Sequence, residues 1–141
     1  NRIERQASVF DGTSSWTYTT AAWRQCHAIA GNKCEIVIGW QDVNVSATAY
    51  ALANNSTATG AATGIGLDST TVNSAQLFGT NVFGTAAIPI SAFYMGMPSI
   101  GYHALNWLEY SFATGACTWR GQNTNVGVIW QQAGLLIRLA G

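Results

Sequence analysis

Short alternating segments, separated by turn residues, constrain the fold of this chain more than any other feature of its sequence. The clearest runs from Val43 to Ala53, where Val and Ala residues alternate with Asn, Ser, Thr, Tyr and Leu residues. Successive side chains of a β-strand point to opposite faces of its sheet. The pattern therefore predicts a strand with one small, apolar face, which suits close approach by a second sheet.

Helical periodicity is missing from the sequence. No window sustains the i, i+3, i+4, i+7 spacing of an amphipathic helix, and Gly, Thr, Ser and Asn recur throughout. We expect residues 1–141 to form one all-β domain, an antiparallel β-sandwich of jelly-roll type with about eight strands. The candidate strands are 7–10, 16–19, 34–38, 43–53, 64–68, 86–93, 101–113, 117–121 and 134–139.

Three connecting features carry more specific predictions. Gly64 and Gly66 indicate a strand that another backbone approaches closely, or one that bulges. Pro89 predicts that its strand lies at a sheet edge, because proline cannot donate a ladder hydrogen bond. Residues 22–25 fit either one helical turn or a crossing loop. The polar, glycine-containing composition of residues 69–84 predicts a long excursion of the chain with little regular structure.

The last third of the chain predicts a long strand followed by a hairpin. One face of the strand 101–113 carries alternate residues that include His103 and Glu109. Gly115 provides a turn, and 117–121 is expected to return antiparallel to that strand. A polar loop, 122–127, then leads to the last strand.

The low charge of the chain predicts self-association. Charged residues make up 9% of the sequence, against about 25% in an average soluble domain. Hydrophobic residues make up 48%, and there are six tryptophans. Because so little charge cannot coat an isolated surface, we expect a stable homo-oligomer, and by analogy a trimer; a low-charge monomer is the alternative.

Charge and hydropathy also argue against two classes of partner. Six basic and six acidic residues cancel, and no Lys/Arg cluster exists, so a nucleic-acid partner is not expected. No apolar run reaches the roughly 18–20 residues that span a bilayer, so membrane insertion is not expected. The chain starts with Asn1 rather than Met, which suggests the C-terminal part of a longer protein.

The three cysteines leave their redox state open. An odd number argues against a fully paired disulfide framework. Cys26 and Cys34 could form a disulfide across a turn, or could be small apolar residues in a reducing compartment. Together with His27 they match no ordinary tetrahedral ligand spacing, so neither a metal nor another cofactor is predicted.

The sequence predicts no catalytic residues. A hydrolase needs paired carboxylates, or a nucleophile with its base. Asp68 and Glu109 are the pair that could supply such chemistry. Ordinary structural roles fit them better: Asp68 as a turn cap, and Glu109 as the partner of Arg120 across the expected hairpin.

The tryptophans fall into two groups. Four lie within strand patterns and are expected to pack in the core or at a subunit interface: Trp16, Trp23, Trp107 and Trp119. Trp40 and Trp130 adjoin loop signals and glutamines, which makes them candidates for surface contact, for instance with sugar rings. The ligand-binding residues stay unassigned.

Five segments carry a resemblance to a known group of proteins. They are Trp16–Gln25, Gly64–Ala75, Gly101–Tyr110, Gly115–Gly121 and Gln131–Leu135. In this order they resemble the C-terminal domain of phage virion and tail-fibre-like proteins, which carry a His-aromatic-Leu-x-Trp-Leu-Glu strand and a Gly-Thr-Thr-Trp-Tyr-Gly hairpin. Here Cys117 and Arg120 replace a threonine and a tyrosine of that hairpin.

The resemblance implies a place on a phage particle that is assembled in bacterial cytoplasm. It favours a non-enzymatic structural domain at the end of a fibre or on a surface appendage, with other virion proteins and a host glycan or protein as partners. Two alternatives are a capsid-decoration or tail-joint protein with no host ligand, and a secreted carbohydrate-binding module.

Overall fold

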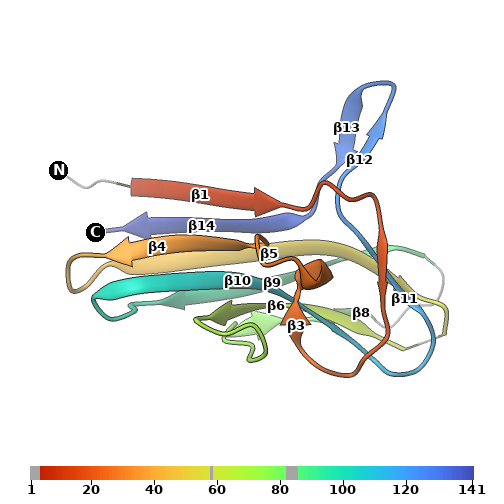
Figure 1. Ribbon diagram of the computed structural model, residues 1–141, viewed down its shortest axis with the longest axis horizontal. Coiled ribbons are helices and arrows are strands. Elements are labelled where there is room, and N and C mark those ends of the chain that lie inside the picture. Colours follow the sequence, from red (N-terminus) through yellow and green to blue (C-terminus); the bar gives the residue numbers. More distant parts are fainter. Residues whose placement is uncertain (1–3, 58, 82–85) are drawn as a thin grey trace.

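The computed structural model describes residues 4–57, 59–81 and 86–141 (Figure 1). Within them the chain forms antiparallel strands and one three-residue 3₁₀ turn, η1 (Cys26–Ala28). Two main sheets lie face to face with a shared hydrophobic core, an arrangement consistent with a β-sandwich. The all-β, antiparallel prediction is confirmed.

The first sheet, sheet A, is built around its longest strand, β5 (Asn44–Asn55). On one side β5 pairs with β9 (Ile88–Gly96). On the other it pairs first with β14 (Gly134–Ala140) and then with β11 (Cys117–Arg120). The outer strands are β1 (Glu4–Phe10) on β14, β2 (Trp16–Tyr18) on β11 and β7 (Leu77–Phe78) on β9.

The second sheet, sheet B, is built around β10 (Gly101–Ser111). One side of β10 pairs with β6 (Ala61–Leu67), which in turn pairs with β8 (Thr80–Asn81). The other side pairs with β4 (Lys33–Ile38) and then with β3 (Arg24–Gln25). A separate hairpin, β12 (Asn123–Asn125) and β13 (Val128–Gln131), projects from the body at the end opposite the termini (Figure 1).

The predicted small face of β5 lies against sheet B. Val45, Ala47, Ala49, Ala51 and Ala53 are all buried. Because alanine side chains are short, β5 comes close to β6 of the opposing sheet, as the sequence predicted. Along β10, His103, Leu105, Trp107, Glu109 and Ser111 are likewise buried and face the core.

Two glycines of β6 admit a neighbouring segment, as predicted. A side-chain carbon at Gly66 would collide with the backbone carbonyl oxygen of Ser69, and one at Gly64 would lie 2.7 Å from Asn73 Oδ1. The excursion after β6 therefore folds back onto the strand. The Ser74 amide donates to the Ile65 carbonyl at 2.7 Å.

The predicted return of 117–121 beside β10 is wrong. Instead, β11 crosses to sheet A and pairs with β5 and β2. The expected packing of Trp119 is confirmed, since Trp119 is fully buried, as is Cys117. Alternation determines which side chains face inward. The place where β11 pairs is determined by β5, whose last residues, 52–55, are left unpaired by β14.

Several element boundaries also differ from the prediction. The described residues contain 14 strands rather than about eight, because several are only two to four residues long. Residues 24–25 are strand, and the helical turn follows at Cys26–Ala28. Residues 122–127 belong largely to a hairpin rather than a loop. Residues 82–85 of the expected excursion lie outside the described residues.

The environment of Pro89 agrees with an edge position. Pro89 pairs only with Leu52 of β5, because β7 reaches no further along β9 than Ala92 and Phe93. Cys26, Cys34 and Cys117 are all free and buried, so the three thiols pack as small apolar groups.

The close approach at Gly66 predicts a large effect for a small substitution. Gly66→Ala should lower the free energy of unfolding by about 1–3 kcal/mol, because the added methyl group must displace backbone. Urea unfolding at pH 7 measures this, and Gly39→Ala is the matched control, since nothing lies within 4 Å of its added carbon. Equal midpoints for the two variants would contradict the close approach.

Candidate functional site

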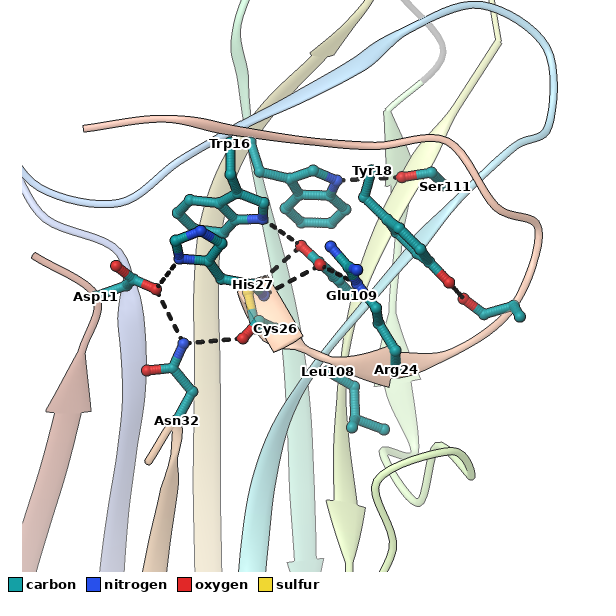
Figure 2. Close-up of polar contacts among 12 residues, drawn as sticks. Asp11, Trp16, Tyr18, Arg24, Cys26, His27, Asn32, Leu108, Glu109 and Ser111 are labelled. Atoms are coloured by element: carbon teal, nitrogen blue, oxygen red, sulfur yellow. Dashed lines mark hydrogen bonds and ion pairs between the residues drawn. The ribbon is translucent and has the colours of Figure 1, made fainter. Parts of the chain in front are cut away.

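The most polar part of the interior surrounds Glu109, at one end of the face-to-face sheets (Figure 2). Glu109 comes from β10 and its side chain is fully buried. Around it gather side chains and backbone from β2, β3 and η1. Because the odd-numbered residues of β10 face sheet A, the strand alternation brings this carboxylate into the core.

Four groups of the described residues point donors at the Glu109 carboxylate. Trp16 Nε1 lies 2.7 Å from Oε2, and Arg24 Nε lies 2.7 Å from Oε1. The backbone amide of His27 donates to Oε1 at 3.0 Å, and Cys26 Sγ lies 3.7 Å from Oε2. An ionised carboxylate only accepts hydrogen bonds, so this ring of donors fits the charged form of Glu109.

Burial and hydrogen bonding act on Glu109 in opposite directions. Desolvation raises its pKa above the ordinary value of 4.5, although hydrogen bonds from Trp16 and Arg24 oppose the shift. Desolvation also raises the pKa of Cys26 well above its usual value, and the nearby Glu109 carboxylate adds to this. Cys26 therefore stays a neutral thiol rather than a reactive thiolate.

A second carboxylate, Asp11, holds the turn next to Glu109. Asp11 Oδ2 lies 2.9 Å from His27 Nδ1 and 3.0 Å from Asn32 Nδ2, and Asn32 also donates to the Cys26 carbonyl at 2.9 Å. His27 and Ala28 have φ values of 57° and 52°, a left-handed conformation that costs energy for residues other than glycine. The two carboxylates hold this strained turn in place.

Aromatic rings close the cluster. The His27 ring stacks on Trp16 with ring centroids 4.5 Å apart, and Trp16 meets Trp107 edge to face at 6.3 Å. The Arg24 guanidinium lies 3.8 Å above the Tyr18 ring. These contacts enclose the carboxylate in protein groups, and the cluster joins β2 of sheet A to β10 of sheet B.

The expected pair of Glu109 with Arg120 is wrong. Arg120 lies in sheet A on β11, while Arg24 of β3 reaches Glu109 from the neighbouring strand of sheet B. Leu108 and Glu109 pair in register with Gln25 and Arg24. Sequence reasoning missed Arg24 because 85 residues separate it from Glu109, and no local pattern links them.

A separate ion pair joins the end of β6 to the start of β10. His103 Nδ1 lies 2.7 Å from Asp68 Oδ2, and His103 Nε2 lies 2.7 Å from the Ser99 carbonyl oxygen. Since both ring nitrogens face acceptors, this geometry favours the doubly protonated imidazolium form of His103. The Ala104 amide also donates to Asp68 at 2.8 Å, so Asp68 binds β10 across the sheet rather than only capping its own turn.

Asp68 and Glu109 do not form a hydrolytic pair. Asp68 binds at Ala104, five residues before Glu109 on the same strand, which places them about 17 Å apart at the rise of a β-strand. Glycosidase carboxyl groups lie roughly 5–9.5 Å apart. Across the described residues, no group of three or more His, Cys, Asp or Glu side chains could hold a metal ion.

Two tryptophans stand at the surface, where the sequence predicted contact residues. Trp40 is 79% exposed and Trp130 is 64% exposed. Trp40 borders a shallow hollow of about 590 Å³ that Arg5 and Leu139 also line, close to the chain ends. Trp130 lies on the projecting hairpin. The other four tryptophans pack inside or partly inside, as expected.

The outer face of sheet A exposes large apolar side chains among polar ones, and no described segment covers them. Six of its side chains are at least 38% exposed: Phe10, Tyr50, Leu77, Phe93, Met95 and Leu136. Strand register places Leu136, Phe93 and Leu77 in one row across the sheet, with Thr48 between the first two. Hollows of about 420 and 450 Å³ lie on this face.

Comparison with known protein families and with curated proteins finds no match to this chain. No helix in the described ranges is long and apolar enough to cross a membrane.

Removing the charge of Glu109 should destabilise the fold. In Glu109→Gln one carboxylate oxygen becomes an NH2 group, which donates hydrogen bonds and cannot accept them. At least one of Trp16 Nε1, Arg24 and the His27 amide then has no acceptor. We expect a loss of about 3 kcal/mol in the free energy of unfolding at pH 7, measured by urea titration. Glu35→Gln, which changes a half-exposed carboxylate, should leave the midpoint unchanged; equal losses would contradict the role of Glu109.

The Asp68–His103 pair should make stability depend on pH. The hydrogen bonds of His103 to Asp68 and to the Ser99 carbonyl oxygen raise the pKa of His103 above its ordinary value of 6.5. Burial acts to raise the pKa of Asp68, but the bonds from His103 and Ala104 outweigh it and lower the pKa below 3.8.

The stabilisation from His103 is therefore complete below pH 6.5 and is lost as pH rises through the raised pKa. That from Asp68 is complete above pH 3.8 and is lost as pH falls through the lowered pKa. His103→Gln should thus destabilise the protein more at pH 5 than at pH 9, which thermal melts at both pH values can measure. Equal losses would show that His103 is neutral at both.

Proposed function

We propose that this chain is a non-enzymatic structural domain of a bacteriophage particle, at the end of a fibre or on the virion surface. The observation that carries the proposal is the set of exposed apolar side chains on the outer face of sheet A. Of the outward-facing residues in 6–10, 46–52, 91–95, 118–120 and 134–138, only Arg120 and Arg138 are charged. A face of this kind suits burial in an assembly rather than contact with water.

Other features support the same assignment. The chain has 9% charged residues, and its polar interior groups bind one another rather than an open pocket. The five segments that resemble phage virion and tail-fibre-like proteins favour a jelly-roll sandwich within a trimer. A rigid trimer presents several equal surface sites, so shallow contacts to a host surface gain strength through avidity.

Host contact is the further part of this proposal. The exposed Trp40 ring offers an apolar platform of the kind that stacks on sugar rings, and the Arg5 beside it adds hydrogen-bond donors. Capsid decoration without a host ligand is the second candidate, and the exposed apolar side chains of sheet A favour it. A secreted carbohydrate-binding module is the third, and exposed Trp40 favours it.

Solution mass followed by cell binding tests the proposal. Light scattering at micromolar concentration should give three times the chain mass, and the same sample should bind intact bacterial cells in a pull-down. A trimer without cell binding would favour the decoration or joint role. A monomer that binds sugar would favour the secreted module and would overturn the virion proposal.

A further inference from the structure

The hairpin of β12 and β13 is the described segment whose exposed side chains are least explained by packing within the chain. It projects from the body just before the start of β14 (Figure 1), and the hydrogen bonds that tie it to the body are at its base. Asn123 Nδ2 donates to the Ser14 carbonyl at 3.4 Å, and Gln131 Nε2 donates to the Gly121 carbonyl at 3.2 Å. An isolated two-stranded hairpin is only marginally stable in water.

The turn and the strand β13 of this hairpin expose apolar side chains, beside the polar Thr124 and Asn125 of β12. Val126 is 95% exposed, Val128 65%, Ile129 50% and Trp130 64%. No residue between Asn123 and Gln131 carries a charge. A solvated hairpin of a soluble protein would expose polar or charged side chains at these positions, so the hairpin is suited to burial against a partner.

The turn of the hairpin is also unusual. Val126 and Gly127 have φ values of 49° and 76°, as the two-residue turns of tight hairpins require. Asparagine or glycine normally occupies the first of these positions, and a β-branched residue there is strained. An apolar, strained and exposed valine at the tip indicates that the tip side chain has a role in contact.

We infer that this hairpin packs onto the outer face of sheet A in a second copy of the chain. This inference rests on the proposed oligomer and identifies its interface. The chain bears both surfaces. The hairpin carries no charge, and the outer face of sheet A carries two, Arg120 opposite Leu52 and Arg138 between Gln6 and Ser46. The hollow bordered by Phe10, Tyr50 and Leu136, about 420 Å³ in volume, offers room for one large side chain such as Trp130.

The area of the two surfaces agrees with a stable contact. An aromatic side chain buries roughly 150–250 Å², so the exposed fractions correspond to on the order of 500 Å² on each surface. Together they reach about 1,000 Å², the size that a specific interface needs. In the proposed trimer the hairpin of each copy meets the sheet of the next, so the contact is head-to-tail and closes as a ring.

Variants of the full chain test the inference. A hairpin variant, Ile129→Ser with Trp130→Ser, should raise the dissociation constant of the oligomer on the order of 100-fold, measured by light scattering over a concentration series. Trp40→Ser is the matched control, since it removes an equally exposed tryptophan near the chain ends. Near-UV circular dichroism of the buried tryptophans checks that each variant is folded.

Mixing variants separates a contact of hairpin with face from a contact between like surfaces, hairpin with hairpin or face with face. A face variant, Tyr50→Lys with Leu136→Lys, should also be monomeric. Mixed with the hairpin variant it should form a one-to-one complex, because one partner keeps its hairpin and the other keeps its face.

Three outcomes would overturn the inference. If the hairpin variant keeps the mass of the wild-type oligomer, the oligomer of the proposed function stands but its interface lies elsewhere. If it keeps that mass and loses cell binding, the hairpin contacts the host instead. A wild-type monomer would overturn both the inference and the oligomer of the proposed function.

Discussion

The buried charge of Glu109 is the constraint on which this end of the sandwich depends. A carboxylate in the core must be surrounded by donors, since an unpaired buried charge would cost several kcal/mol. The donors come from Trp16, Arg24 and the His27 amide, which lie far from Glu109 in the sequence. Satisfying one side chain therefore positions β2, β3 and η1 against β10. The left-handed turn at His27 persists because Asp11 and Glu109 both hold it.

The two sheets differ in what covers them. On sheet B, Gly64 and Gly66 leave room for the segment that follows β6, and Leu108 is fully buried although it faces outward. On sheet A no described segment covers the outer face, and large apolar side chains are exposed there. Since the chain has little charge to make such a face soluble, this difference is the physical basis for placing the subunit contact on sheet A.

The three carboxylates described above hold segments of the fold together. Asp11, Glu109 and Asp68 each accept several internal hydrogen bonds, and the hollows on sheet A and beside Trp40 are lined mainly by other residues. Among the exposed features of the described surface, three are rich in apolar side chains: the hairpin tip, the sheet A face and Trp40. Such surfaces fit recognition by packing more than they fit catalysis, and this agrees with the proposed virion role.

The sequence by itself determined the all-β class, the inward face of β5, the grouping of side chains on the two faces of β10, the close approach at Gly66 and the exposure of Trp40 and Trp130. These follow from local alternation and from residue size, which act within a few positions of the chain. Only the tertiary structure decided that β11 pairs with β5 instead of β10, that Arg24 rather than Arg120 meets Glu109, and that 123–131 leaves the body as a hairpin. Each of these depends on which distant segment fills a sheet edge or satisfies a buried charge, and alternation along one strand carries no information about that partner.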